Sequence, residues 1–427
     1  MALLVQKNSF GFVAWCGVIA LIFFSSKEVL SNPVNYEDLA IKFIEETQQE
    51  LLKNSDDMQS SFGLGMAYQV VGDHKAAIKV FRGMLRVDPS LLRPRLELGK
   101  SLYLTQQFDE ALYHLEQVAA HSLPSDVAAS VKNLISEIKT NQPSFIYEVF
   151  WVKDTNPNRS TASTTLSMQG LQYALSENSQ QREVQGIRVV LNGHIPLLRK
   201  KNWFAKIQTE HTQYDLESLN FSAFQATLGQ THKIKNTLLT MQLGPIVARY
   251  GNSPLYNGHI LSGTITKPVT KRHLSYLTIN RRNLDYEDQY DGYDAISTGY
   301  EIGLSYRPDL QKHWNIKLGS VDHLADFDFN TFQEIYLSVS LNLELLSGWR
   351  VVGEYAAKNK RFQASDPLFA ITRHDQVQEA LLTVANTDFS FKGLVPRLIF
   401  KKSNGSSTID LHDYTRFGVM LGVGKVF

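Results

Sequence analysis

The side chains best suited to chemistry lie in three polar stretches of the C-terminal two-thirds of the chain. The first stretch holds four potential cation ligands: Asp322, His323, Asp326 and Asp328. The second, residues 285–294 (DYEDQYDGYD), carries several carboxylates but lacks the ligand spacing of a calcium-binding loop. The third offers the residue types of a serine hydrolase: Ser406, His412 and Asp413. No buried orienting partner is suggested for these three, so we interpret all three stretches as solvated loops.

Other catalytic patterns are missing from the sequence. It contains no Gly-rich phosphate loop and no His pair at metal-ligand spacing. Cys16 is the single cysteine, so thiol catalysis, thiolate metal binding and disulfides are not expected in the exported chain. The net charge of +1 gives no indication of nucleic-acid binding. We therefore predict a protein that is not an enzyme, needs no cofactor and has no nucleic-acid partner.

The first 31 residues have the pattern of a signal peptide. Lys7 supplies a short basic region, and the following stretch from Gly11 to Phe24 is uncharged and apolar. Its length fits a signal-peptide core and is short for a membrane span. Val29 and Ser31 fit a cleavage site before Asn32, and a retained anchor is the alternative. We predict residues 1–31 to be a signal peptide and residues 32–141 to form a periplasmic domain.

Residues 36–140 show helical periodicity with a repeat of 34 residues. Small and large apolar residues recur at this offset, where small residues permit close helix approach and large ones fill the space between helix pairs. The repeat-packing positions are Leu64, Gly65, Tyr68, Ala77, Phe81 and Pro89 in the first unit, and Leu98, Gly99, Ala111 and Leu115 in the second. The pattern resembles the tetratricopeptide repeat, with flanking helices expected at 36–53 and 126–139.

Beyond Asn141–Pro143 the helical period gives way to alternation of apolar and polar residues. Residues 295–306 and 334–344 show it clearly. Short connections alternate with longer ones, near 285–294, 322–330, 358–374 and 404–412, as in outer-membrane barrels. The first strand must run outward from the periplasm and the last strand must return to it. The barrel therefore has an even number of strands. We predict a 14-stranded antiparallel transmembrane β-barrel over residues 142–427, with the alternating stretch Leu166–Tyr173 as loop or lumen-inserted material.

The final residues, MLGVGKVF, resemble the C-terminal signal that the barrel-assembly machinery reads. Gly422 and the terminal Phe427 occupy the favoured positions, whereas Lys425 stands where an apolar residue is usual. We therefore expect outer-membrane lipid and the barrel-assembly machinery as partners.

The order of signal peptide, tetratricopeptide-like domain and 14-stranded barrel resembles the surface lipoprotein assembly modifiers (Slam), the outer-membrane translocators of type XI secretion. The residues that carry this resemblance are Asp366, Leu368, Phe369, Arg373 and Asp375 (DPLFAITRHD), then Pro396, Ser403, Asn404, Tyr414 and Arg416, and, after the first strand, Asp154 and Asn156. Residues 170–175 (GLQYAL) resemble the segment that follows.

The resemblance implies a translocator that moves lipoproteins or secreted proteins, commonly iron- or haem-acquisition cargo, from periplasm to cell surface. It leaves open whether the motif residues contact cargo or stabilise the barrel, for example through an Arg373–Asp375 pair. Two other functions remain possible from the sequence: an outer-membrane porin, and a polysaccharide export channel with a periplasmic repeat domain.

Overall fold

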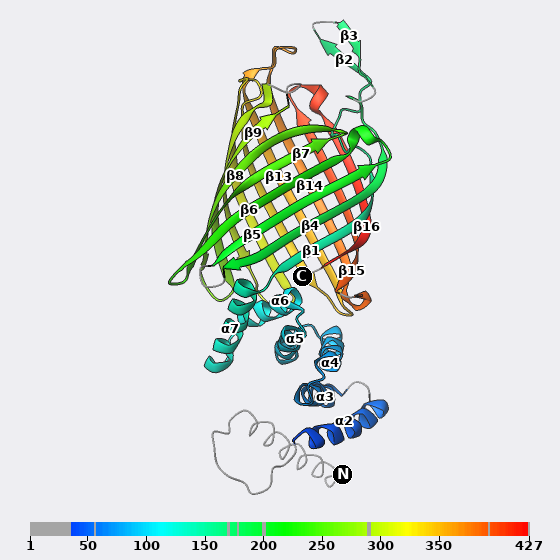
Figure 1. The fold of residues 1–427 in the computed structure, drawn as a ribbon. Coiled ribbons are helices and arrows are strands. Elements are labelled where there is room, and N and C mark those ends of the chain that lie inside the picture. Colours follow the sequence, from blue (N-terminus) through cyan, green and yellow to red (C-terminus); the bar gives the residue numbers. More distant parts are fainter. Residues whose placement is uncertain are drawn as a thin grey trace.

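The computed structural model describes residues 36–54, 57–168, 171–176, 179–198, 202–287, 292–391 and 393–425. A stack of helices lies against one mouth of a β-barrel (Figure 1). We call this mouth the near end and the opposite mouth the far end. The predicted signal peptide and Phe427 lie outside the described residues.

The part of the chain described contains six helices before the barrel: α2 (Tyr36–Lys53), α3 (Met58–Val70), α4 (His74–Val87), α5 (Leu92–Leu104), α6 (Phe108–Ala119) and α7 (Ser125–Asn141). Asp57 and Asp73 begin α3 and α4, because each side chain accepts hydrogen bonds from free N–H groups of the first turn. Among the described helices, none is both long and apolar enough to cross a membrane.

Successive helices pack as the 34-residue period requires. A Cβ atom on Gly65 would lie 2.5 Å from the Phe81 ring, and one on Gly99 would lie 3.0 Å from the Leu115 side chain. Phe81 and Leu115 are fully buried. The period extends to the backbone, since Gly72 and Gln106 stand 34 residues apart, and both have positive φ angles, of 76° and 62°. Gly72 follows α3, where a left-handed residue satisfies the last carbonyl groups of a helix.

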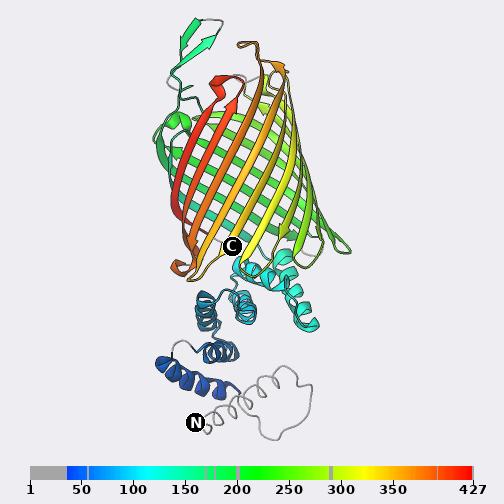
Figure 2. The same ribbon diagram turned by 180° about the vertical axis from the view of Figure 1, so that it is seen from behind.

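Fourteen strands within the described residues form one closed antiparallel barrel, which confirms the predicted fold class. They are β1 (Ser144–Asp154), β4 (Val184–Leu198), β5 (Trp203–Tyr214), β6 (Phe221–Ile234), β7 (Thr237–Tyr250), β8 (Ser253–Pro268), β9 (His273–Tyr286), β10 (Ala295–Tyr306), β11 (Lys312–Ala325), β12 (Phe332–Glu344), β13 (Trp349–Ser365), β14 (Thr372–Asn386), β15 (Leu394–Ser407) and β16 (Tyr414–Lys425). Neighbours in sequence are neighbours in the ring, and β16 closes it against β1 (Figure 2).

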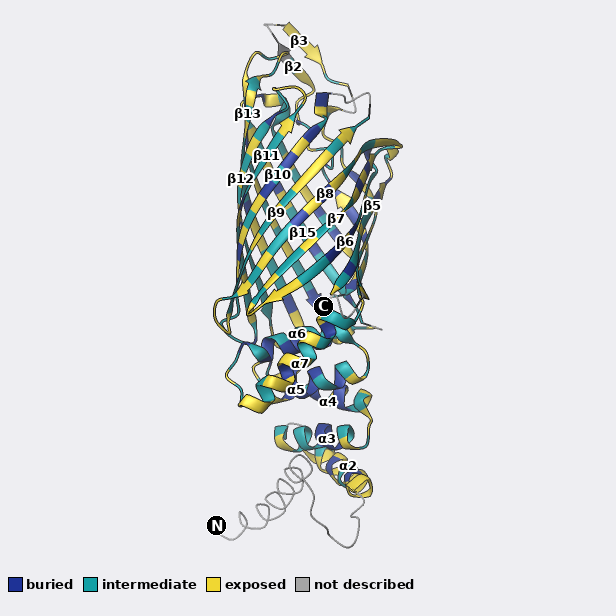
Figure 3. Cartoon of the chain, turned by 60° about the vertical axis from the view of Figure 1, so that its left-hand side comes forward, coloured by how far each residue is buried: buried dark blue, intermediate teal, exposed yellow. Residues whose placement is uncertain are grey.

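The strands alternate exposed and covered residues (Figure 3). In β10, Tyr300, Ile302 and Leu304 are exposed on the outer wall, while Ser297 and Ser305 are buried on the inner wall. Apolar side chains outside and small or polar ones inside are what a lipid-facing wall and a polar lumen demand. The alternation of apolar and polar residues in the sequence therefore corresponds to the outer and inner faces of the barrel wall.

The loop expectations were partly right: Leu166–Tyr173 lies in the loop between β1 and β4, but Asp322 and His323 lie within β11 and Ser406 lies within β15. β13 and β14 continue to Ser365 and from Thr372, so most of the long connection expected at 358–374 is strand. The pairing of β13 with β14 continues beyond the segment in which apolar and polar residues alternate. Outward-facing side chains beyond the lipid contact water, so they need not be apolar. The stretch Leu166–Tyr173 forms a separate hairpin of β2 (Thr165–Met168) and β3 (Leu171–Ala174), which projects beyond the far end and does not enter the lumen (Figure 1).

Candidate functional site

Polar side chains from distant parts of the chain meet in two places. The first, the far-end cluster, lies on the inner wall beside β1 and β16 and contains most of the family-motif residues. The second, the near-end interface, joins α4–α6 to the turns and strand ends of the near mouth.

Asp154 and Arg416 form the centre of the far-end cluster. Asp154 ends β1 and is only 3% exposed, and Arg416 lies beside it on β16. The Arg416 Nε atom donates to both Asp154 oxygens at 3.0 and 2.9 Å, and Nη2 donates to Oδ2 at 2.5 Å. A planar guanidinium matches a carboxylate in this two-point geometry. The pair therefore ties the first strand to the last at the far end.

Asn156 continues this connection into the loop after β1. It is fully buried, and its side-chain amide donates to the carbonyl oxygens of Ser160 at 2.8 Å and of Thr415 at 3.2 Å. Its own backbone N–H donates to Asp154 Oδ1 at 3.0 Å. A buried amide with each of these partners is held in one orientation. The Asp-x-Asn element thus orders the loop against β16.

Arg373 and Asp375 pair on β14, with Nε to Oδ1 at 2.9 Å and Nη2 to Oδ2 at 2.8 Å. Asp375 also accepts a hydrogen bond from the Ser407 hydroxyl at 2.7 Å, and the Arg373 guanidinium lies over the Phe362 ring. This pair connects β13, β14 and β15. The turn before it is capped by Asp366, whose Oδ1 accepts from the N–H groups of Leu368 and Phe369 at 2.8 and 3.3 Å, with the Leu368 side chain exposed.

Ser403 and Tyr414 complete the cluster around a carboxylate that the motif does not include, Glu379. Lys358 and Arg159 approach Glu379 at 2.7 and 3.2 Å. The fully buried Ser403 hydroxyl lies 3.2 Å from the Tyr414 hydroxyl. A cavity of about 260 Å³ lies beside Arg159, Lys358 and Tyr414, and its lining also includes Lys360, Arg373, Asp375 and His412. Four cationic side chains and two carboxylates line it, Glu334 and Asp375 being the carboxylates, so the lining is charged with an excess of positive groups.

The remaining motif residues do not join this cluster. Asn404 is exposed on the outer face of β15. Pro396 pairs with Val423, and Gly422 pairs with Phe150, both toward the near end. The structure brings together Asp154, Asn156, Arg373, Asp375, Ser403, Tyr414 and Arg416 at one wall, and leaves the others apart.

Arg95 of α5 dominates the near-end interface. It is 0% exposed, and its Nη1 atom donates to Glu344 Oε2 at 2.9 Å, at the end of β12. The Tyr113 hydroxyl of α6 donates to the same oxygen at 3.0 Å, and the Arg350 guanidinium of β13 lies 4.0 Å over the Tyr113 ring. Nη2 of Arg95 donates to the Pro89 carbonyl at 2.6 Å. A repeat-packing proline therefore also orients the side chain that reaches the barrel.

Two titratable residues of α6, Glu110 and His114, lie one helical turn apart. The His114 Nδ1 atom lies 3.4 Å from Arg95 Nη1. Burial raises the pKa of Glu110, but the nearby His114 and the Arg82 guanidinium outweigh burial and hold that pKa at about 2. Arg82 Nη2 donates to both Glu110 oxygens, at 2.8 and 2.6 Å. Burial lowers the pKa of His114, so its ring is neutral at pH 7. The interface thus keeps a carboxylate charged and an imidazole neutral.

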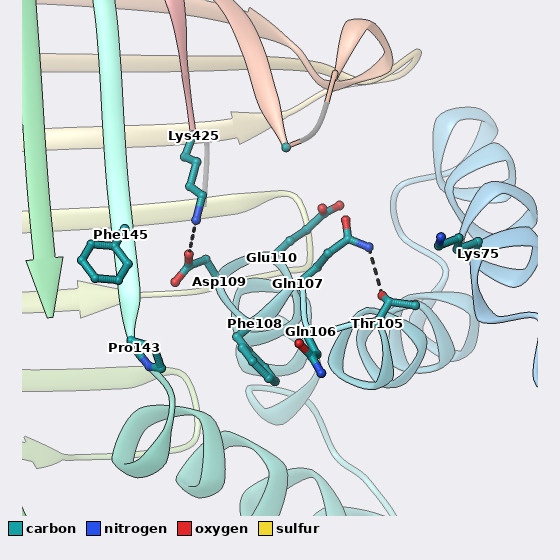
Figure 4. A pocket seen from close by; sticks show the side chains of 11 residues that line it. Lys75, Thr105, Gln106, Gln107, Phe108, Asp109, Glu110, Pro143, Phe145 and Lys425 are labelled. Carbon is teal, nitrogen blue, oxygen red and sulfur yellow. Dashed lines mark hydrogen bonds and ion pairs between the residues drawn. The ribbon is translucent and has the colours of Figure 1, made fainter. Parts of the chain in front are cut away.

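The two ends of α6 reach different parts of the barrel. At its start, Asp109 Oδ2 accepts from Lys425 Nζ at 2.9 Å (Figure 4). Its Oδ1 accepts from the Ser144 hydroxyl at 2.5 Å. Near its end, Glu116 pairs with Arg307 at 3.0 Å. Arg307 directly follows β10, which in the described ring lies six steps from β16, close to half-way round. α6 therefore bridges the near mouth from the junction of the first and last strands to the opposite rim.

Sequence reasoning missed Arg95, Asp109, Glu344 and Glu379. Arg95 and Glu344 are ordinary charged residues in their local patterns, and only the packing of the two domains buries them. Lys425 was the one available signal, because it interrupts an apolar strand end. Its partner Asp109 accounts for that exception.

A closed barrel with an apolar outer wall, a charged inner wall and helices across one mouth defines an outer-membrane β-barrel with an accessory domain. The model of the family described as "Surface lipoprotein assembly modifier" matches residues 144–427. The chain belongs to this family, whose match spans the whole barrel.

Similarity to a characterised protein extends into the helical domain. The hemophilin secretion modulator of Acinetobacter baumannii is 23% identical over 398 residues, which cover 85% of this chain and 78% of that protein. Among solved structures, the outer membrane channel DcaP of Acinetobacter baumannii has 12% identity and a TM-score of 0.39, covering 66% of this chain and 96% of its own. The anion-selective porin from Comamonas acidovorans has 9% identity and a TM-score of 0.37, covering 67% and 100%. These two similarities carry no inference about function.

Proposed function

We propose that this outer-membrane protein translocates specific lipoproteins or secreted proteins from the periplasm to the cell surface. The observation that carries the proposal is the family match over the complete barrel, residues 144–427. The name of the relative, a hemophilin secretion modulator, favours haem- or iron-acquisition proteins as the cargo class. The protein acts without catalysis or a cofactor.

In this proposal residues 1–31 direct export, and residues 32–141 form a periplasmic domain that receives cargo. Parity supports the orientation: β1 leaves the helical domain and β16 returns to it, and most of the connections on that side are shorter than those at the far end. The barrel-assembly machinery inserts residues 142–427 into outer-membrane lipid, with Gly422 and Phe427 as part of its signal. Stacked helix pairs offer an extended surface for an unfolded segment.

The charge pattern of the inner wall suits the passage of a polypeptide. Along the far-end cluster each cation has a carboxylate nearby, as in the Lys358–Glu379 and Lys360–Glu334 pairs. These carboxylates weaken the positive field that would otherwise retain an acidic cargo segment. Folding of the cargo at the cell surface supplies the direction of transport.

Surface and secreted proteomes of cells with and without this chain test the proposal. We expect a small set of proteins to lose surface exposure or release in the deletion strain and to regain it when the chain is restored. An unchanged set in both compartments contradicts translocation. Liposome swelling with purified protein tests the porin alternative, because a porin conducts small solutes without any cargo.

A second variant, lacking residues 32–141 but retaining the export signal, tests the helical domain. We expect the barrel to assemble and cargo display to be lost. Normal display from the isolated barrel refutes the role given to the helical domain while leaving translocation by the barrel intact.

A further inference from the structure

The junction of β1 and β16, which we call the seam, has the shortest pairing in the barrel among the described residues. Its seven pairs run from Glu148–Gly424 to Asp154–Gly418, whereas β1 and β4 share eleven. Three of the inward-facing pairs contain a glycine of β16: Gly418, Gly422 and Gly424. Glycine offers no side chain for cross-strand packing and weakens a strand. At three of its four described inward-facing pairs, the seam therefore has a side chain from β1 alone.

The far end of the seam is nevertheless firmly held. The buried Asp154–Arg416 pair joins the two strands there, and Asn156 reaches the Thr415 carbonyl. The backbone continues the connection, since Thr155 N–H donates to the Phe417 carbonyl at 2.9 Å and Phe417 N–H donates to the Thr155 hydroxyl at 2.9 Å. Separation of β1 from β16 at this end requires the loss of all these contacts.

The near end of the seam is held differently, by charged side chains that come from other elements. Arg397 of β15 reaches over the glycines of β16 to pair with Glu148 of β1. Asp109 of α6 uses one oxygen for Ser144 at the start of β1 and the other for Lys425 at the end of β16. A single carboxylate of the helical domain therefore connects both strands of the seam.

We propose that the seam opens from its near end, with Asp109 as the latch and the Asp154–Arg416 pair as the hinge. The occupant of the opened seam is an extended segment of the cargo polypeptide. This inference rests on the proposed function and specifies the route of the cargo within it.

The hydrogen-bonding groups exposed by a separated seam favour an extended polypeptide as the occupant. Separated strand edges expose backbone N–H and C=O groups, which cannot remain unpaired in a membrane. An extended polypeptide satisfies them by strand addition, through main-chain hydrogen bonds that tolerate many sequences. The place where such a segment arrives is a cavity of about 410 Å³ beneath the seam, with Phe108, Pro143 and Phe145 as apolar lining beside Asp109 and Lys425 (Figure 4).

A disulfide across the near half of the seam tests the route. Val149 and Val423 are paired and exposed on the outer wall, and the native chain has only Cys16. We expect Val149→Cys/Val423→Cys to stop display of the cargo set identified by the proteome comparison when oxidised, and to restore it on reduction. The matched control is Ile302→Cys/Leu318→Cys, a paired, exposed position on the opposite side of the ring, which is expected to transport in both states.

Transport by the oxidised seam variant at the wild-type level overturns the inference and assigns the route to the lumen. The proposed function survives that result, because cargo still moves. It fails separately if the wild-type chain itself displays no dependent protein.

Hydrogen exchange on the purified full chain tests the latch without any cargo. In Asp109→Ala we expect exchange at residues 422–424 to accelerate by roughly tenfold or more, because tenfold corresponds to loss of one charge-assisted hydrogen bond and this variant loses the bonds to both Ser144 and Lys425. Residues 417–419, beside the hinge, are expected to change much less. Asp126→Ala removes an exposed carboxylate of the same domain and serves as control. Equal exchange at 422–424 in Asp109→Ala and wild type contradicts a latch at Asp109, whatever the cargo does.

Discussion

Arg95 and Glu344, which are 249 residues apart in the sequence, form an ion pair of 2.9 Å that joins the helical domain to the barrel. The arginine has no exposed surface, and the glutamate accepts a second hydrogen bond from Tyr113. Removal of Glu344 leaves both Arg95 and Arg350 without their shared carboxylate, whereas removal of Arg95 leaves Glu344 with Arg350 at 3.8 Å. Breaking a buried ion pair typically costs about 3–5 kcal/mol, so the larger effect is expected for Glu344.

We therefore predict that Arg95→Met and Glu344→Gln both loosen the helical domain from the near mouth. Limited proteolysis of the full chain in detergent measures this as faster cleavage between α7 and β1. Lys42→Met is the matched control, because the Lys42–Glu46 pair is exposed and exposed pairs contribute about 0–1 kcal/mol. Equal cleavage rates in all four proteins contradict a docking role for Arg95.

The stability of the helical domain is expected to fall with acidity in two stages. The pKa of His114 is lowered on folding, so the unfolded chain binds a proton more readily and stability declines as the pH drops below about 6.5. The pKa of Glu110 is about 2 in the folded chain, so its contribution is complete above about pH 4.5 and is lost as the pH falls toward 2.

Thermal melting followed by circular dichroism at 222 nm checks this dependence. We expect the midpoint to be constant from pH 7 to 8 and several degrees lower at pH 5, because one kcal/mol moves it by about 4–8 °C in a domain of this size. His114→Gln is expected to remove the upper stage and keep the lower one. A midpoint that rises between pH 7 and 5 refutes the assignment.

Asp154→Asn is predicted to destabilise the closed barrel by about 3–5 kcal/mol, since it leaves the Arg416 guanidinium without its charged partner. Arg416→Lys is expected to recover little, because an ammonium group lacks the two-point geometry. The temperature at which the folded band disappears in unheated gel electrophoresis measures the effect. Lys153→Met, at the neighbouring position with an exposed partner, is the control and is expected to behave as wild type.

Gly65→Ala is predicted to destabilise the helical domain by about 1–3 kcal/mol, although alanine is the better helix former. Its Cβ would overlap the Phe81 ring, which is fully buried and has nowhere to move. Gly83→Ala in α4 meets nothing closer than 3.9 Å and is expected to stabilise the domain by up to about 1 kcal/mol. Opposite shifts of the melting midpoint confirm close helix approach at the first repeat position, and shifts of the same sign contradict it.

Gln106→Gly completes this series. Gln106 has a φ of 62°, where a non-glycine residue costs about 1 kcal/mol, whereas Gly72 occupies the equivalent place in the first unit without that cost. The substitution is expected to raise the melting midpoint by a few degrees. Gly72→Gln should lower it by a similar amount, and the absence of this reciprocity argues against equivalent turns.

Much of the architecture was predictable because each element carries its own periodicity. Gly65, Phe81, Gly99 and Leu115 reveal the helix pairs through their spacing, and the alternation around Ile302 and Leu337 reveals strands with two unlike faces. Parity of the connections then predicts the strand number. The extent of β13 and β14 was not predictable, because paired strands beyond the lipid lose the alternation that marks them.

The polar sites were less accessible to prediction. Asp154 and Arg416 stood out by resemblance, but their pairing depends on barrel closure, which joins residues 262 positions apart. Arg95 and Asp109 both form contacts between the helical domain and the barrel. Helical periodicity predicts which face of a helix is apolar, but it does not predict which charged residue meets a distant strand. Lys425 marked an exception in the sequence without indicating its partner.

The bridge formed by α6 also orders the biogenesis of the protein. The helical domain is synthesised before the barrel, yet Asp109 binds Lys425, which lies 316 residues further along the chain. Glu116 binds Arg307, which reaches its place only when the opposite side of the ring has formed. The domain cannot dock fully on an incomplete barrel. Docking of α6 is thus a readout of barrel completion, and a stalled or truncated barrel leaves the helical domain undocked and exposed to proteases.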